Sequence, residues 1–218
     1  ETLGRYTAKT FGWMFAGLLM TFAVAMFGYV TGYVFYLFMI PYFPMILLLA
    51  EVGVVIYLSA RIEKMSVGTA RAMFFVYAAL NGVVFSSLFL IYQLTSLVLA
   101  FGACSLFFGI MAALGYTTNA DFSRLRPFML GGLIFLVAFW ILSIFINLSQ
   151  FETAVCALGI FLFLVITAYD TKKIRLYHQV YSGRPEIAAK ASIFAALELY
   201  LDFINLFLYL IRITGKRK

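Results

Sequence analysis

Five polar residues near the end of the chain recur at helical spacing. Glu198, Asp202, Asn205, Tyr209 and Arg212 follow one another at intervals of 4, 3, 4 and 3 residues, and most residues between them are apolar. On an α-helix this spacing places all five side chains on one narrow face. Two carboxylates one turn apart repel when both are ionised, so we expect one of them to keep a proton or hold a cation. The alternative is a polar face that only fixes helix packing.

Three more charged residues could join this chemistry. Asp170 precedes a basic stretch and Arg61 ends an apolar segment, whereas Glu51 lies ten residues before Arg61. Ten residues of helix span about 15 Å. Depth therefore predicts an inner cluster of Arg61, Asp170 and Asp202, and an outer pair of Glu51 and Arg212. The simpler alternatives are an ordinary acid at a helix end and an arginine that extends to the membrane surface.

The composition indicates where these residues must lie. The chain has 218 residues, of which 65% are hydrophobic and 11% are charged, and its mean hydropathy is +1.02. A soluble domain is roughly 45–50% apolar and about 25% charged. So much apolar surface must face lipid or other buried helices. This excludes a disordered chain, a disulfide-stabilised scaffold and a collagen-like fibre.

A span takes about 20 apolar residues, and six segments satisfy this easily. A seventh segment qualifies with polar interruptions. A membrane β-barrel would instead show alternating runs of roughly 10 residues. We therefore predict an all-α membrane protein, a bundle of seven transmembrane helices in a single domain over residues 1–218. The first segment is expected to be a mature span rather than a signal peptide. The predicted spans are residues 11–33, 44–60, 72–92, 96–116, 128–147, 153–170 and 187–213.

The loop charges predict the orientation. Lys and Arg are absent from the predicted loops after the first, third and fifth spans, so these loops are expected outside the cytoplasm. Seven crossings would place the C-terminus outside although the tail is basic. An uninterrupted last segment is easier to build as a crossing than as a re-entrant loop. The N-terminus and the other loops, predicted to be cytoplasmic, carry Arg5, Lys9, Arg61, Lys64, Arg71, Arg124, Arg126, Lys172, Lys173, Arg175 and Arg184.

Several other functions are not favoured. The formal charge of +7 is spread over short loops, which does not indicate nucleic-acid binding. Cys104 and Cys156 lie in apolar segments without metal-binding spacing, so no tightly bound cofactor is predicted. His178 is expected to be a solvated side chain, and Lys190 lies too near the start of its span for a retinal pump.

An enzyme is not predicted either. Tyr169-Asp170 resembles one half of an intramembrane aspartyl protease dyad. The second half of such a dyad normally lies in a Gly-x-Gly-Asp context, whereas here it is Tyr200-Leu201-Asp202.

Two segments carry a family resemblance. They are Thr167-Ala168-Tyr169-Asp170-Thr171-Lys172-Lys173-Ile174 and Leu199-Tyr200-Leu201-Asp202-Phe203-Ile204-Asn205-Leu206-Phe207. Together they closely resemble the signature of the transmembrane Bax inhibitor motif family, in particular its bacterial members. The similarity covers essentially the whole chain, including the seven apolar segments and the polar last helix.

The resemblance implies a bundle with the seventh helix at its centre and a pH-sensitive calcium leak across a bacterial plasma membrane. In the family two aspartates form a hydrogen-bonded proton sensor, and they match Asp170 and Asp202. An arginine at the inner end of the second helix binds this pair, and Arg61 is the best match. A glutamate in the second helix pairs with an arginine late in the seventh, which match Glu51 and Arg212.

Calcium would be the transported substrate, and it takes about 6–8 oxygen ligands. Asp170 and Asp202, with Glu198 and Asn205 beside the ion path, could form a weak site of this kind. Glu198 departs from the family pattern, in which a small polar residue is expected. The expected partners are the lipid bilayer, calcium and protons, besides membrane proteins that sequence does not identify. The alternative is a regulatory interaction protein, in stress survival or membrane-protease control, that conducts nothing itself.

Overall fold

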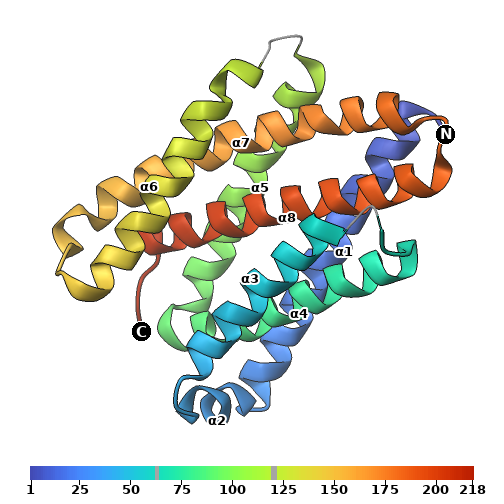
Figure 1. Ribbon diagram of the computed structural model, residues 1–218. Helices are drawn as coiled ribbons and strands as arrows, with labels where there is room; N and C mark the ends of the chain where they lie inside the picture. The colour runs from blue at the N-terminus through green and yellow to red at the C-terminus, as the bar shows by residue number, and fades with distance from the viewer. Residues whose placement is uncertain (62–63, 119–121) are drawn as a thin grey trace. The chain divides into compact units, whose positions relative to one another are not determined.

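The computed structural model describes residues 1–61, 64–118 and 122–218 (Figure 1). These residues form helices and no β-strand. The long helices are α1 (Leu3–Val30), α3 (Phe43–Arg61), α4 (Val67–Ile91), α5 (Leu94–Thr117), α6 (Arg126–Phe145), α7 (Glu152–Tyr181) and α8 (Pro185–Thr214). Shorter helices are α2 (Tyr33–Met39), η1 (Phe122–Leu125) and η2 (Ser149–Phe151).

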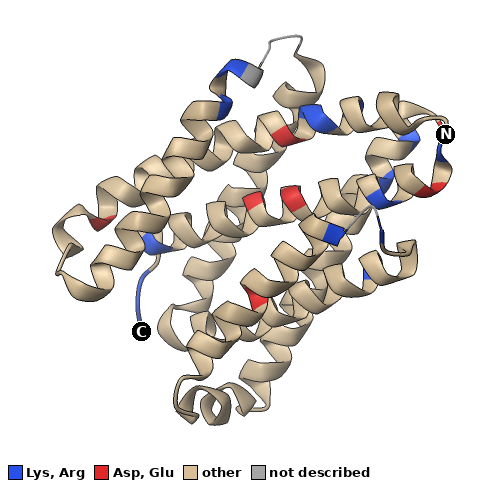
Figure 2. Ribbon diagram, in the orientation of Figure 1, with Lys and Arg blue, Asp and Glu red and all other residues tan. Residues whose placement is uncertain are grey.

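The seven long helices confirm the prediction of an all-α, seven-span protein. Each is long and apolar enough to cross a membrane, and Figure 2 shows that charged residues are sparse along all of them. The chain is therefore an integral membrane protein. In α8, 72% of the most apolar 18-residue stretch is buried within the protein, against 11 to 44% in the other six helices. This burial agrees with the central position predicted for the last helix.

The helices differ most from the expected ones at α1, α2 and α7. Helix α1 begins at Leu3, well before the predicted start, and α2 was not expected. Helix α7 does not end at Asp170 but continues to Tyr181. The reason is that the basic stretch after Asp170 contains no glycine or proline before Gly183, and Lys and Arg are good helix formers. Asp170 is thus an interior residue of α7 rather than a helix-end acid.

The described chain divides into two compact units. The first unit comprises Glu1–Gln93, Ile174–Tyr200 and Arg217–Lys218, and the second comprises Leu94–Lys173 and Leu201–Lys216. Helices α7 and α8 each contribute residues to both units. One membrane domain over the whole chain stays a prediction.

In the first unit, α1 and α4 approach each other closely through small residues. The buried residues of α1 include Gly17, Thr21, Ala25 and Gly28, spaced three or four apart. A Cβ atom placed on Gly82 of α4 would lie 2.8 Å from the carbonyl oxygen of Thr21. Small residues at such spacing let membrane helices pack backbone to backbone.

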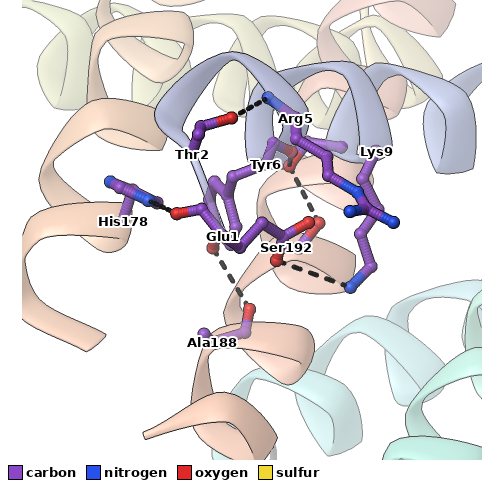
Figure 3. Close-up of polar contacts among 9 residues, drawn as sticks. Glu1, Thr2, Arg5, Tyr6, Lys9, His178, Ala188 and Ser192 are labelled. Atoms are coloured by element: carbon purple, nitrogen blue, oxygen red, sulfur yellow. Dashed lines mark hydrogen bonds and ion pairs between the residues drawn. The ribbon is translucent and has the colours of Figure 1, made fainter. Parts of the chain in front are cut away.

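The start of α1 is bound to α7 and α8 in the same unit (Figure 3). The Tyr6 hydroxyl donates a hydrogen bond to the Ala188 carbonyl at 3.2 Å, and the hydroxyls of Thr10 and Ser192 lie 2.9 Å apart. His178 Nε2 lies 2.9 Å from the Glu1 carbonyl oxygen. The N-terminal parts of α1 and α8 therefore lie at the same end of this unit.

The C-terminal tail contacts the opposite end of α1. Lys218 Nζ donates to the Phe89 carbonyl at 2.8 Å and to the Tyr29 hydroxyl at 3.4 Å. Tyr29 is in the last turn of α1 and Phe89 is in the last turn of α4. Within the first unit, Ala188 near the start of α8 and Lys218 after its end therefore contact opposite ends of α1.

In the second unit, aromatic side chains of α5 and α7 pack around the C-terminal half of α8. Phe101 and Phe108 contact the ring of Phe203 edge to face, with centroids 5.4 and 5.6 Å away. Phe163 of α7 stacks on Tyr209 at 6.0 Å. Asp202 is next to Phe203 in the sequence, so these contacts fix the orientation of this part of α8 about its own axis.

Candidate functional site

The polar face predicted for the last helix lies on a single continuous helix. Helix α8 is uninterrupted because no glycine or proline occurs between Pro185 and Gly215. Burial changes along the face: Asp202 and Tyr209 are buried, Glu198 and Asn205 are half-buried and Arg212 is exposed. The most buried carboxylate on this face is therefore Asp202.

Asp170 and Asp202 lie together within the second unit. Asp170 is 7% exposed and Asp202 is 3% exposed, and the two carboxyl groups lie within hydrogen-bonding reach of each other. A carboxylate only accepts hydrogen bonds, so a hydrogen bond between them needs a proton on one of the two groups. We call these two residues the aspartate pair. Their geometry permits a shared proton, and deprotonation would leave two buried negative charges side by side.

Lys173 places a cation beside Asp170. Its ammonium lies 2.8 Å from Asp170 Oδ1, one helical turn further along α7. The same ammonium lies 5.2 Å from the centre of the Tyr169 ring. Hydropathy ends the sixth span at Asp170 and so assigns Lys173 to a loop, whereas in the structure Lys173 lies in α7. Within one helix, a three-residue interval brings the two side chains together.

Close contact between α5 and α7 positions Asp170. Gly115 of α5 lies directly against the backbone of Ala168, so closely that a Cβ atom there would overlap its carbonyl group. Elsewhere on α5, the Cys104 thiol donates to the carbonyl of Phe203 at 3.5 Å. Ala168 lies two residues before Asp170 and Phe203 directly follows Asp202, so α5 contacts both helices close to the aspartates.

The predicted inner arginine belongs to the first unit. Arg61 is the last residue of α3 and is exposed. Its contact with the aspartate pair stays a prediction.

Glu51 also belongs to the first unit, where it is half-buried in α3. Its Oε1 atom is buried and has no hydrogen-bond partner among residues 1–61, 64–118 and 122–218. The predicted pair of Glu51 and Arg212 stays a prediction.

Within the second unit, Arg212 contacts Glu152 and Trp140. Its guanidinium lies 3.6 Å from Glu152 Oε1 and 4.1 Å above the Trp140 ring. Trp140 Nε1 donates in turn to the Tyr209 hydroxyl at 3.3 Å. Sequence reasoning missed Glu152. The available signal was its position at the start of a span, at the same predicted depth as Arg212.

Asn205, which was predicted to lie beside the ion path, bonds to its own helix: its Nδ2 donates to the Leu201 carbonyl at 2.8 Å. Among the described residues, no group of three or more His, Cys, Asp and Glu side chains has an arrangement that could hold a metal ion. An ion path along Glu198 and Asn205 stays a prediction.

Comparison with known proteins covers nearly the whole chain. Residues 3–218 match the family model described as inhibitor of apoptosis-promoting Bax1. An uncharacterised protein of Rickettsia prowazekii is 37% identical over 218 residues, covering 100% of this chain and 92% of the relative. The inner membrane protein YbhL of Escherichia coli K12 is also 37% identical, over 99% of this chain and 93% of the relative. An uncharacterised Borreliella burgdorferi protein is 35% identical, with coverages of 98% and 93%.

Proposed function

This chain belongs to the Bax inhibitor-1 family of integral membrane proteins, and on that premise we propose that it is a calcium leak pathway gated by protons. The gate is the aspartate pair, Asp170 and Asp202. The observation that carries the proposal is the close approach of these two buried carboxyl groups. A hydrogen bond between them needs a shared proton, so this arrangement couples local structure to pH.

The gate works by loss of this shared proton. At low pH the pair holds one proton and its hydrogen bond keeps α7 and α8 together, which closes the path. At higher pH both groups ionise, repel each other and bind cations, and α8 shifts. Arg61 stabilises the closed state at the inner end of the path. Glu51 and Arg212 form the second charge pair, towards the outer side.

Calcium is the transported substrate and not a resident cofactor. Asp170 and Asp202 supply carboxylate oxygens, Glu198 and Asn205 line the path, and water and backbone carbonyls complete the coordination that calcium requires. A weak site suits conduction because the ion must also leave.

The orientation follows the loop charges, with the N-terminus in the cytoplasm of a bacterial plasma membrane and the C-terminus outside. The contacts of Ala188 and Lys218 with opposite ends of α1 support a last helix that crosses the membrane. The description of the Escherichia coli relative as an inner membrane protein supports the location.

Calcium flux into vesicles that contain only the purified protein tests the proposal. Wild-type flux should rise as pH increases over about pH 5 to 8. Asp170→Asn and Asp202→Asn should each abolish that pH dependence because neither can form the ionised pair. The matched control is Glu186→Gln, which neutralises an exposed acid in the first turn of α8, the helix that carries Asp202. A wild-type flux that ignores pH and survives both Asn substitutions would contradict the gate.

The same measurement distinguishes a calcium leak from the alternative function. A regulatory interaction protein, acting in stress survival or on a membrane protease, would conduct no calcium in protein-only vesicles at any pH. Absence of flux from correctly folded protein would therefore favour the regulator over the leak.

A further inference from the structure

We infer that Lys173 is a tethered cation that competes with calcium at Asp170 and thereby keeps the aspartate pair a weak, rapidly released site. The inference rests on the proposed function, which it deepens by naming what sets cation affinity. Lys173 is a positioning and affinity-setting residue, because it acts on the carboxylate that meets the ion.

The geometry places a permanent competitor at the carboxylate. The ammonium lies 2.8 Å from Asp170 Oδ1, and the side chains of Lys173 and Asp170 are 19% and 9% exposed. An ion pair this sheltered is less screened by water and salt than a surface pair. A calcium ion that binds the same oxygen must first displace the ammonium, so part of its binding free energy is lost to that displacement.

The Lys173 ammonium also lies near an aromatic ring. Its distance of 5.2 Å from the centre of the Tyr169 ring is within the range of a cation–π interaction. Lys173 can therefore leave Asp170 without losing all of its favourable contacts. This makes the exchange between ammonium and calcium reversible with only a side-chain movement.

The neighbouring lysine offers a matched control. The ammonium of Lys172 lies 5.6 Å from the centre of the Phe122 ring, also in the second unit. The two lysines share charge, helix and sequence neighbourhood, and it is the Lys173 ammonium that lies 2.8 Å from Asp170 Oδ1. A general effect of positive charge on this helix would be the same for both, whereas competition at Asp170 concerns Lys173.

The test measures equilibrium binding of radioactive calcium to the full-length purified protein, and in parallel the calcium dependence of vesicle flux. Lys173→Met removes the charge and keeps the length of the side chain. We expect its half-saturating calcium concentration to fall about tenfold, from loss of a nearby unit charge. Maximal flux should fall as well, because release becomes slower. Lys173→Arg should stay near wild type, and Lys172→Met should change binding by less than about twofold.

A second substitution separates competition from a structural effect. In the Asp170→Asn background, Lys173→Met should no longer tighten binding, because the carboxylate for which the two cations compete is absent. If Lys173→Met does not fold, the polar, neutral Lys173→Gln gives the same readout. Unchanged or weaker calcium binding in the folded neutral variants overturns the inference, as does absence of binding in both wild type and variant. Absence of flux with calcium binding intact instead contradicts only the transport function.

Discussion

The contacts of single side chains differ in strength because their surroundings differ. Arg212 and Glu152 form an ion pair in which both side chains are well exposed, at 40% and 39%. Water screens such a pair, and it contributes about 0–1 kcal/mol. The Trp140 ring beneath Arg212 adds a cation–π contact and a hydrogen bond to Tyr209. The aromatic contact is therefore expected to hold Arg212 more firmly than the carboxylate does.

Substitution of these two partners tests that order. Glu152→Gln should lower the free energy of unfolding by less than about 1 kcal/mol, whereas Trp140→Ala should lower it by about 1–3 kcal/mol. Trp140→Phe keeps a ring but loses the N–H donor, so it should fall between them. Thermal unfolding of the purified protein in detergent measures all three. A larger loss for Glu152→Gln than for Trp140→Ala would contradict the argument.

The buried hydroxyl of Thr21 makes a second residue-scale prediction. It lies 2.6 Å from the Tyr200 hydroxyl and donates to backbone carbonyls of α1 and α4. Thr21→Val leaves the fully buried Tyr200 hydroxyl without this partner, which should cost about 1–3 kcal/mol of unfolding free energy. Thr117→Val, at an exposed threonine that bonds to its own helix, should change stability by less than about 0.5 kcal/mol. Equal thermal shifts in the two variants would argue against a structural role for this contact.

Residue spacing predicted some of the site and not the rest. The five-residue face of α8 needed only a helical period, and no glycine or proline interrupts it. The contact of Lys173 with Asp170 could be predicted only from the true end of α7, which lies beyond the apolar segment that hydropathy detects. The contact of Glu152 with Arg212 depends on which helices pack together, and spacing along the chain does not give that. A period within one element is local, whereas a contact between elements is decided by tertiary packing.

At the scale of elements, the contact of α5 with α7 determines where Asp170 lies. Gly115 is required there because the backbone at Ala168 occupies the space that a side chain would need. The sequence contains sixteen glycines, and nothing in the chain alone distinguishes this one from Gly109 on the same helix. Close backbone approach is a property of two helices, so it was not predictable from either helix by itself.

Alanine substitution at these two glycines tests the positioning role. Gly115→Ala should force α5 and α7 apart and destabilise the protein by about 1–3 kcal/mol through overpacking. It should also alter the pH dependence of calcium flux, because the displaced segment carries Asp170. Gly109→Ala meets no atom within 4 Å and should leave both properties unchanged or raise helix stability slightly. Unaltered stability and flux in Gly115→Ala would contradict the positioning role of this contact.

For the whole molecule, the number of crossings decides on which side each end of the proposed path opens. Hydropathy and loop charge predict seven crossings, but the basic C-terminal tail conflicts with the loop-charge pattern. Within the first unit the tail residue Lys218 contacts Tyr29 at the end of α1, while Ala188 near the start of α8 contacts Tyr6 at the other end. A re-entrant last segment would return its tail to the end where it began. The packing of the first unit thus favours a last helix that crosses the membrane, a point on which hydropathy and the basic tail disagree.

Labelling of single cysteines in whole cells tests this topology. With Cys104 and Cys156 replaced by alanine, an impermeant maleimide should label Ile146→Cys and Lys216→Cys in intact spheroplasts. Arg124→Cys should label only after the membrane is permeabilised. All three positions are exposed, so differences in labelling report the side of the membrane and not burial. If Lys216→Cys labels together with Arg124→Cys, the last helix does not cross, and both the outward C-terminus and the depth assigned to Arg212 are wrong.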